Sequence, residues 1–388
     1  MTDQPSWGAA ARGLWGLEPG LRFLNHGGYG ATPLAVQAEQ AEWRARMERN
    51  PPRFLSRELP GLLRQAAVDL AGFVGTRPER LAFVSNATAG VNAVLRSLEL
   101  APGDEIVHTD HVYNAVRQTL RHVTAGSGAR CVEAVIGMPV QGAQQILNAV
   151  TAACTDRTRL VVIDHVASAS AVAFPVAAIA ALCRARGLWL LVDGAHAPGL
   201  LELDVDAIDA DWYVGNCHKW LCAPKGAGFI AVARRPTPQI HPPVLSHAYG
   251  QGFVPEFDWT GTQDPTAFLA VPAALRFHAA LGGPALRARN RAMAADLAQE
   301  LAAEFGTGLG ASVDMFHAMA TIALPPCSAD LATIRHLQAV LHDRHQIEAV
   351  FTLLAAQLWL RISVQAYTTR QDFAGLGDII HAALTGTR

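Results

Sequence analysis

The sequence predicts an α/β protein with a mainly parallel central sheet. Between Pro78 and about Arg235, short strand candidates rich in β-branched residues alternate with Ala- and Leu-rich stretches at helical period. A helix between consecutive strands acts as a crossover connection, so the strands pair in parallel. The helices then cover both faces of the sheet. A content of 51% hydrophobic and 16% charged residues excludes a disordered chain and is typical of a globular protein with a sizeable core.

Six strands are expected in this region, each a short apolar run bounded by turn or helix signals. They are residues 81–84, 105–108, 159–163, 188–192, 212–214 and 228–232. The helices expected between the earlier strands are residues 89–98, 115–123, 144–154 and 176–186.

The second part of the chain has a different pattern. Residues 236–264 are rich in Pro and Gly and are expected to be irregular, as functional loops and linkers often are. Helices are then expected over 265–280, 284–305 and 331–345, with strands over 318–324 and near 359–364. The expected organisation is an N-terminal arm (1–20), a large α/β domain (21–264) and a small α+β domain (265–388) that can pack with the N-terminal segment.

Charge and hydropathy exclude several classes of partner. The 31 Lys and Arg residues balance 33 Asp and Glu residues, without a basic run, so neither nucleic acid nor an acidic membrane surface is expected as a partner. The longest apolar stretch, 171–183, contains Pro175 and is too short to span a bilayer. The first twenty residues lack a secretory pattern, and the six cysteines form no C-x-x-C, so free thiols in the cytoplasm are expected. A small-molecule ligand is therefore favoured.

Residues with chemical potential follow the ends of three predicted strands. In open α/β sheets, ligands bind beyond the carboxyl ends of the strands. Residues 85–90 open a helix, where free N–H groups bind anions, although an ordinary helix cap explains them equally well. Asp193 ends an apolar run and needs a cation, such as a protonated heteroaromatic nitrogen, unless it only caps the turn. Lys219 lies beside aromatic residues, where partial burial would lower its pKa and free the amine for Schiff-base chemistry. Cys217, His218 and Cys222 lack the spacing of a zinc site, so no metal is expected.

Together these motifs resemble the class V aminotransferase family of pyridoxal-phosphate (PLP) enzymes. The Asp193 strand end, the His218-Lys219 pair and the turn Pro224-Lys-Gly-Ala-Gly228 are typical of the family. The chain is more narrowly similar to its isopenicillin N epimerase-like branch over roughly positions 20 to 370. Five segments carry this likeness: Phe23-Leu-Asn-His-Gly-Gly-Tyr-Gly30, Asn50-Pro-Pro-Arg-Phe54, Asp193-Gly-Ala-His-Ala-Pro-Gly199, Gly215-Asn-Cys-His-Lys-Trp-Leu221 and Trp259-Thr-Gly-Thr-Gln-Asp264.

The resemblance implies fold type I, with a seven-stranded sheet, and assigns cofactor roles. Lys219 would bind PLP as a Schiff base and then move the substrate α-proton, while Asp193 would pair with the pyridinium nitrogen. His196 and Ser168 would lie near the phenolic oxygen of PLP. The position of Asn216 commonly holds Ser in the family, so the Asn fits only the narrower branch. The residues expected at the phosphate are Ala87, Thr88, Asn216, His218 and, from a neighbouring subunit, Thr262.

The resemblance also implies residues on the substrate side. His111, with Tyr113 as its competitor, is expected to stack on the cofactor or act on the substrate, unless either is only a turn residue. Arg361 matches the family's arginine that binds the substrate carboxylate, and Asn25 and Arg57 are weaker candidates for the substrate pocket. Cysteine desulfurases of this family carry a loop cysteine about 15 residues before that arginine. Residues 345–361 contain none, which disfavours persulfide chemistry.

The expected function is therefore that of a PLP-dependent homodimer acting on an amino acid. Epimerisation, C–S bond cleavage and transamination all begin with removal of the α-proton by Lys219, and the first two rank nearly equally. Transamination ranks third. The alternative from another class is a catalytically silent protein that keeps the PLP fold, which the joint presence of Asp193, His196, Lys219 and Arg361 disfavours.

Overall fold

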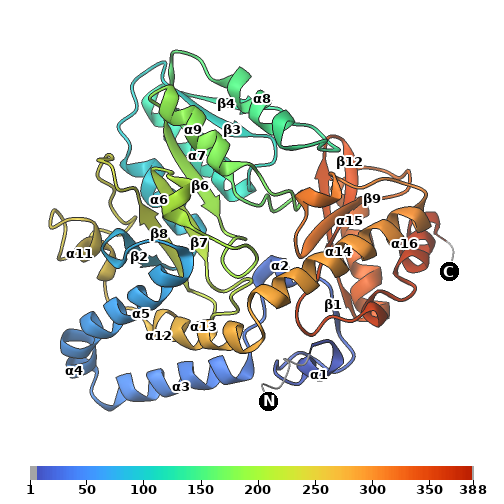
Figure 1. The fold of residues 1–388 in the computed structure, drawn as a ribbon, viewed down its shortest axis with the longest axis horizontal. Helices are drawn as coiled ribbons and strands as arrows, with labels where there is room; N and C mark the ends of the chain where they lie inside the picture. Colours follow the sequence, from blue (N-terminus) through green and yellow to red (C-terminus); the bar gives the residue numbers. More distant parts are fainter. Residues whose placement is uncertain (1–6, 387–388) are drawn as a thin grey trace.

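The large sheet has seven strands and lies in one half of the molecule. The computed structural model describes residues 7–386. The spatial order of the strands is β2-β8-β7-β6-β5-β3-β4, and only β8 runs antiparallel to its neighbours (Figure 1). The strands are β2 (Leu81–Val84), β3 (Glu105–Thr109), β4 (Arg130–Ala134), β5 (Thr158–Asp164), β6 (Trp189–Gly194), β7 (Trp212–Asn216) and β8 (Gly228–Val232).

All six strands predicted for this region are present, and the mainly parallel α/β class is confirmed. The strand missed by the sequence analysis is β4. It lies at the edge of the sheet, and Arg130 and Glu133 are exposed on it, so it lacks the apolar run of a buried strand.

Helices cover both faces of the large sheet, as predicted. On one face, Val91 of α6 (Ala87–Ser97) and Leu120 of α7 (Asn114–Ser127) share a core with alternate sheet residues such as Val162. The opposite face packs against helices α5, α8 and α9. Their bounds, with that of the short α10, are α5 (Leu59–Val74), α8 (Ala143–Ala153), α9 (Val176–Ala185) and α10 (Val205–Ile208). This alternation fixes which side chains point to each face of the sheet.

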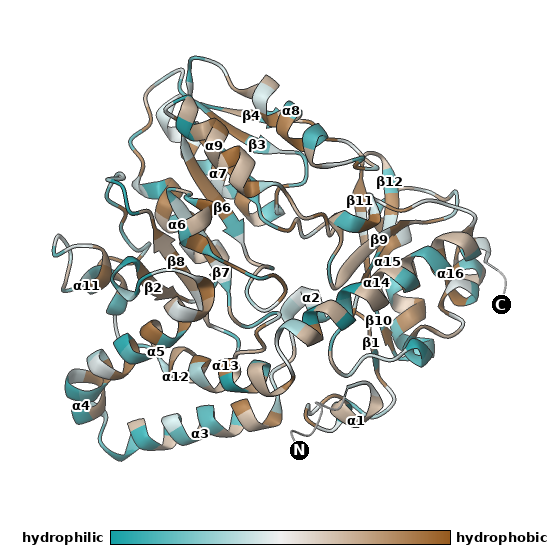
Figure 2. Ribbon diagram, viewed as in Figure 1, coloured by the Kyte–Doolittle hydropathy of each residue, from teal (hydrophilic) through white to brown (hydrophobic). Residues whose placement is uncertain are grey.

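The N-terminal segment, for which the sequence analysis gave no elements, is mostly helical. Figure 2 shows many hydrophilic residues along α3, whereas the strands of the large sheet are mostly hydrophobic. Because only Val36 of α3 is buried, its sequence lacks the apolar stripe of a core helix. The helices are α1 (Ala9–Arg12), α2 (His26–Tyr29), α3 (Leu34–Arg49) and α4 (Pro51–Arg53), followed by a π-helical turn (Phe54–Glu58).

The segment predicted to be irregular contains one short helix, α11 (Phe253–Asp258). The single helix expected over 265–280 is two helices, α12 (Thr266–Leu269) and α13 (Val271–Ala280), because Pro272 stands in the first turn of the second. Both pack on α3 and α5 of the large domain. The domain boundary at residue 264 stays a prediction; these two helices follow it in the sequence but pack on helices that precede it.

The small sheet lies at the other end of the molecule (Figure 1). Three antiparallel strands, in the order β11-β12-β9, pack against α14 and α15. Their bounds, with those of the flanking helices, are β9 (Met319–Ala323), β11 (Val350–Leu354), β12 (Gln357–Ser363), α14 (Pro284–Phe305), α15 (Leu331–Ala339) and α16 (Leu376–Thr385). A π-helical turn (Val340–Arg344) extends α15 close to its predicted end. The strand β11 was not predicted, although Val350-Phe-Thr-Leu-Leu354 is a short apolar run; it lies at the edge of the small sheet.

The N-terminal chain joins this small domain. Strand β1 (Arg22–Phe23) pairs in parallel with β10 (Ile347–Glu348), and the backbone N–H of Ser363 donates to the carbonyl of Leu24. Among residues 7–386, no helix combines the length and apolar character needed to cross a membrane.

Candidate functional site

The candidate site begins where three parallel strands end together. Asp164 of β5 lies in register with Asp193 of β6, and Gly194 of β6 lies in register with Gly215 of β7. The loops that follow β6 and β7 then carry His196 and Lys219. The strand order therefore brings together side chains that the sequence analysis found at separate strand ends.

Lys219 is half-buried at the centre of this edge. Its Nζ lies 3.0 Å from Nε2 of His196. Burial, aided by the charge of Arg361, lowers the pKa of Lys219 to about 8, although Asp193 and Asp164 act in the opposite direction. About a tenth of the Lys219 amine is therefore uncharged at pH 7 and about half at pH 8, and the free amine is the form that attacks a carbonyl carbon.

Close backbone packing fixes the Lys219 loop. Gly30 has a φ of 69°, and a Cβ there would lie 2.0 Å from the carbonyl oxygen of His218. Gly199 has a φ of 84°, and its Cβ would lie 2.6 Å from the carbonyl carbon of Trp220. Both positions need glycine, which explains why two of the segments that carry the resemblance end in this residue.

Asp193 and Asp164 form a buried acidic pair beside the lysine. One oxygen of Asp193, Oδ1, accepts a hydrogen bond from the backbone N–H of Ala195 at 2.9 Å. Burial raises the pKa of both carboxyl groups, and the charge of Asp193 raises that of Asp164 further. Oδ2 of Asp164 is buried and has no hydrogen-bond partner within residues 7–386. A ring nitrogen that carries a proton fits such an acidic site.

The N-terminus of α6 is partly satisfied by side chains. Asn86 caps the helix by accepting from the backbone N–H of Ala89 at 2.9 Å, so the cap considered in the sequence analysis is present. Asn216 accepts from the backbone N–H of Ala87 at 2.8 Å. The structure therefore brings Ala87, Thr88 and Asn216 together at one helix end, where an anion is favoured.

Two further residues were predicted at the phosphate, and neither forms a hydrogen bond with Ala87, Thr88 or Asn216 within residues 7–386. His218 is half-buried, with Nδ1 3.3 Å from the carbonyl oxygen of Ala227, and burial lowers its pKa to about 4. Thr262 is exposed on the loop that follows α11. Their roles at the phosphate stay predictions.

A cavity of about 600 Å³ opens on the other side of Lys219. Arg361 reaches it from β12 and is buried, unlike an arginine on the surface of a strand. Its Nη2 donates to Oδ1 of Asn25 at 3.0 Å, and its Nη1 donates to the hydroxyl of Ser168 at 3.2 Å and to the carbonyl oxygen of the same residue. Burial lowers the pKa of Arg361 to about 10, so it remains a cation at neutral pH. Ser168 thus contacts the predicted carboxylate-binding residue.

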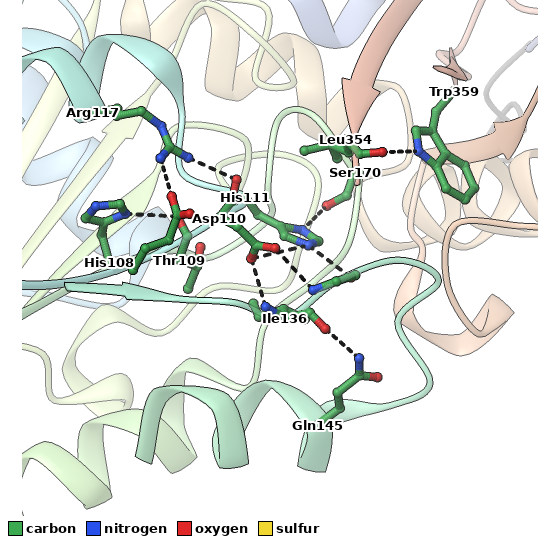
Figure 3. A network of polar contacts seen from close by, with 12 residues as sticks. His108, Thr109, Asp110, His111, Arg117, Ile136, Gln145, Ser170, Leu354 and Trp359 are labelled. Carbon is green, nitrogen blue, oxygen red and sulfur yellow. Dashed lines mark hydrogen bonds and ion pairs between the residues drawn. The ribbon is translucent and has the colours of Figure 1, made fainter. Parts of the chain in front are cut away.

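His111 and Tyr113 both line this cavity but differ in burial. His111 is buried, and its Nδ1 lies 2.8 Å from the hydroxyl of Ser170 (Figure 3). Burial lowers the pKa of His111, so the ring is neutral at pH 7. Tyr113 is 47% exposed at the start of α7. The difference favours His111 as the fixed ring of the site and places Tyr113 at its rim.

Arg57 and the cysteines do not line this cavity. Arg57 is exposed in the π-helical turn before α5 and does not line the described cavity, so its role stays a prediction. None of the six cysteines, all within the described residues and all free, lines the cavity. Asp164 was not predicted from the sequence. A polar residue at the end of an apolar strand was the available signal for Asp164.

Comparison with known proteins decides the family. The family model described as Aminotransferase class-V matches residues 34–376. The chain belongs to the class V aminotransferase family. It is accordingly a PLP-dependent enzyme, and the buried acidic pair, the helix N-terminus and the free amine of Lys219 fit this cofactor.

The class V relatives with curated functions are named for two different reactions. Isopenicillin N epimerase of Amycolatopsis lactamdurans is 35% identical and aligns with 96% of this chain and 97% of its own. The probable chloroplastic L-cysteine desulfhydrase of Arabidopsis thaliana is 28% identical over 94% of this chain and 83% of its own. Among solved structures, the cystine C–S lyase C-DES superposes with a TM-score of 0.79 at 19% identity, covering 93% of this chain and 97% of that one. This likeness confirms fold type I.

Proposed function

We propose that this class V enzyme removes the α-proton of an amino acid, with Lys219 as the base. The observation that carries the proposal is the position of Lys219. Its amine, with a pKa lowered to about 8, lies at the boundary between the acidic strand ends and a cavity that holds a buried arginine. A base with a pKa near the working pH is suited to general acid–base catalysis.

Cofactor binding would use the residues at the strand ends. PLP, when bound, supplies an electron-withdrawing ring that stabilises negative charge at the substrate α-carbon. Asp193 would hold the ring nitrogen, and His196 would donate a hydrogen bond to the phenolic oxygen. The phosphate would meet the N-terminus of α6, together with His218 and the side chain of Asn216.

Substrate binding would use Arg361. Its guanidinium is held by Asn25 and Ser168 in a fixed orientation, and a carboxylate can accept from two of its N–H groups at once. Nε of Arg361 is buried without a partner within the described chain, so one donor is available to a ligand without loss of an existing bond. An α-amino acid anchored in this way would present its α-carbon to Lys219.

The fate of the α-carbon separates two reactions. Epimerisation is supported by the 35% identity to isopenicillin N epimerases and requires a second proton donor, for which Tyr113 at the rim and His111 are available. C–S bond cleavage is supported by the relatives named L-cysteine desulfhydrase, at 28–29% identity. A persulfide route is disfavoured, since none of the six cysteines lines the cavity.

An isotope experiment separates these reactions. The PLP-loaded enzyme is incubated in heavy water with cystine, cysteine sulfoxides and a panel of other amino acids, and pyruvate and α-deuteration are measured together. Deuterated product of inverted configuration identifies an epimerase, and pyruvate without exchanged substrate identifies a lyase. A protein that stays colourless after incubation with PLP contradicts the proposal as a whole.

The proposed assembly is a homodimer in which Thr262 completes the phosphate site of the other subunit. The exposed side chains of Val244, Leu245 and Tyr249, on the same long segment, support an interface there. In a mixed dimer, one subunit with Lys219→Ala supplies an intact Thr262 to the partner with Thr262→Ala. Mixing the two inactive or weakened variants should therefore restore activity, and a monomeric mass in solution contradicts this assembly.

The proposed compartment is the cytoplasm. All six cysteines are free, and Cys183, Cys217 and Cys222 are buried, as expected of thiols in a reducing environment. Fractionation of the cells that make the protein tests this proposal.

A further inference from the structure

His196 makes two hydrogen-bonding contacts with different chemical requirements. Its Nδ1 lies 3.2 Å from Nε1 of Trp220, and its Nε2 lies 3.0 Å from Nζ of Lys219. An indole N–H can only donate a hydrogen bond, so Nδ1 of His196 must be the acceptor and carries no proton. A neutral imidazole bears one proton, which is then on Nε2.

The charge of the ring follows from its surroundings. His196 is buried, and the charged or titratable groups that face it are Lys219, Arg361 and His218. Burial first, and then these cationic groups, hold the pKa of His196 well below its usual range. The imidazole is therefore neutral, and an imidazolium is excluded because its Nδ1–H would face the indole N–H.

The Nε2–H of this tautomer points at Lys219. An ammonium group has three N–H donors and no lone pair, so it cannot accept a hydrogen bond, whereas the free amine can. The arrangement of the three side chains is therefore complete only when Lys219 is neutral. This agrees with the lowered pKa of the lysine, on which Asp193 and Asp164 act in the opposite direction.

Trp220 is itself held firmly in place. It is buried, its ring centroid lies 5.2 Å from that of His26, and a Cβ on Gly27 would lie 3.1 Å from its Cζ2. The backbone of Trp220 packs against Gly199, as described above. The segments that contain Gly27 and Gly199 thus hold the indole ring in place. The direction in which its N–H points is therefore set before any ligand binds.

We propose that Trp220 is a positioning residue that locks His196 as the Nε2–H tautomer. In this form His196 donates to the free amine of Lys219 and, once the cofactor is bound, to its phenolic oxygen. The hydrogen bond to the phenolic oxygen rests on the proposed function. The tautomer of His196 and its hydrogen bond to Lys219 concern the cofactor-free protein alone.

The first test needs no cofactor, and its one variant serves only to assign the signal. Nitrogen-15 NMR of the cofactor-free protein with labelled histidine should show one ring, identified by its loss in His196→Gln, with a protonated Nε2 and an unprotonated Nδ1. The opposite tautomer, or a cationic ring at neutral pH, overturns the proposal. Because PLP is absent, this result is independent of the proposed function.

The second test removes only the indole N–H. Trp220→Phe keeps an aromatic ring and should leave His196 as a mixture of both tautomers. In the PLP-loaded protein, the pH midpoint of the visible absorbance should move by about one unit, because the phenolic oxygen loses a committed donor. An unchanged His196 spectrum in this variant overturns the role of Trp220.

Trp212→Phe is the matched control. Trp212 is fully buried in β7, and its Nε1 has no hydrogen-bond partner within residues 7–386, so this variant leaves a similar cavity without removing a bond. It should lower thermal stability without moving the tautomer signal or the pH midpoint. A shift of equal size in both variants shows that packing alone is responsible and contradicts the proposal.

Discussion

The two sides of the site are assembled in different ways. On the cofactor side, Asp193, His196, Asn216 and Lys219 come from two neighbouring strands and lie within 27 positions of one another in the sequence. On the substrate side, Arg361 contacts Asn25, 336 positions away, and Ser168, 193 positions away. Strand order positions the first group, whereas the second depends on the docking of the N-terminal segment and the small sheet. Changes on the two sides should therefore damage different functions.

The largest effect is expected from Lys219→Ala. Removal of the base should lower turnover by about 10³-fold and abolish covalent attachment of the cofactor. Lys225 is the only other lysine in the sequence, and it is exposed, with Nζ 3.3 Å from the Thr32 hydroxyl. Borohydride trapping followed by peptide mass analysis should place the cofactor on Lys219 alone, and Lys225→Ala should retain its visible absorbance. Trapping on Lys225 in the wild type contradicts the assignment.

Arg361→Ala is expected to separate the two sides. Loss of a hydrogen-bonded charge pair costs about 3 kcal/mol, so kcat/KM should fall by about 10²-fold while the visible absorbance of the cofactor stays. Steady-state kinetics and absorbance on the same sample check this. Arg370→Ala is the control, because Arg370 is exposed and pairs only with Asp296 and Glu300 on the surface. If Arg361→Ala loses both the visible absorbance of the cofactor and its activity, Arg361 does not act on substrate binding alone, and the proposed separation of the two sides is wrong.

The pH dependence of cofactor attachment tests the lowered pKa of Lys219 on the cofactor side. Lys219 attacks as the free amine, and its lowered pKa of about 8 means that this form is lost as the pH falls. The initial rate of PLP attachment should therefore level off above pH 8 and fall about tenfold per unit below it. Stopped-flow absorbance measures the rate. A plateau that begins only near pH 10 indicates an ordinary exposed lysine.

The smallest effect is expected from Ser168→Ala. The hydroxyl orients Arg361 through one hydrogen bond, while the carbonyl oxygen of the same residue keeps its contact with the guanidinium. KM should rise about threefold with kcat nearly unchanged, which corresponds to less than about 1 kcal/mol. A change in the cofactor spectrum of this variant would instead place Ser168 beside the phenolic oxygen, as the family resemblance implied.

The same contrast explains what the sequence could predict. Lys219 and Asp193 were found because apolar strands that end in polar residues leave a local signal. Arg361 could be assigned only through resemblance, since no local pattern links it to Asn25 or Ser168. The edge strand β4 was missed because the exposed Arg130 and Glu133 interrupt its apolar residues, whereas β11 was missed although its sequence is largely apolar. Trp220 was missed because an indole acquires its role from a partner on another loop, which the fold alone provides.

The pairing of β1 with β10 bears on the order in which the protein is made. Residues 22 and 23 leave the ribosome first, but their partners at 347 and 348 follow after most of the chain has been synthesised. The large sheet, in contrast, is complete once residue 232 has emerged. At roughly 5–20 residues per second, the later strand follows by several seconds. The strand ends that carry Asp193 and precede Lys219 can thus be complete before Arg361 has been synthesised.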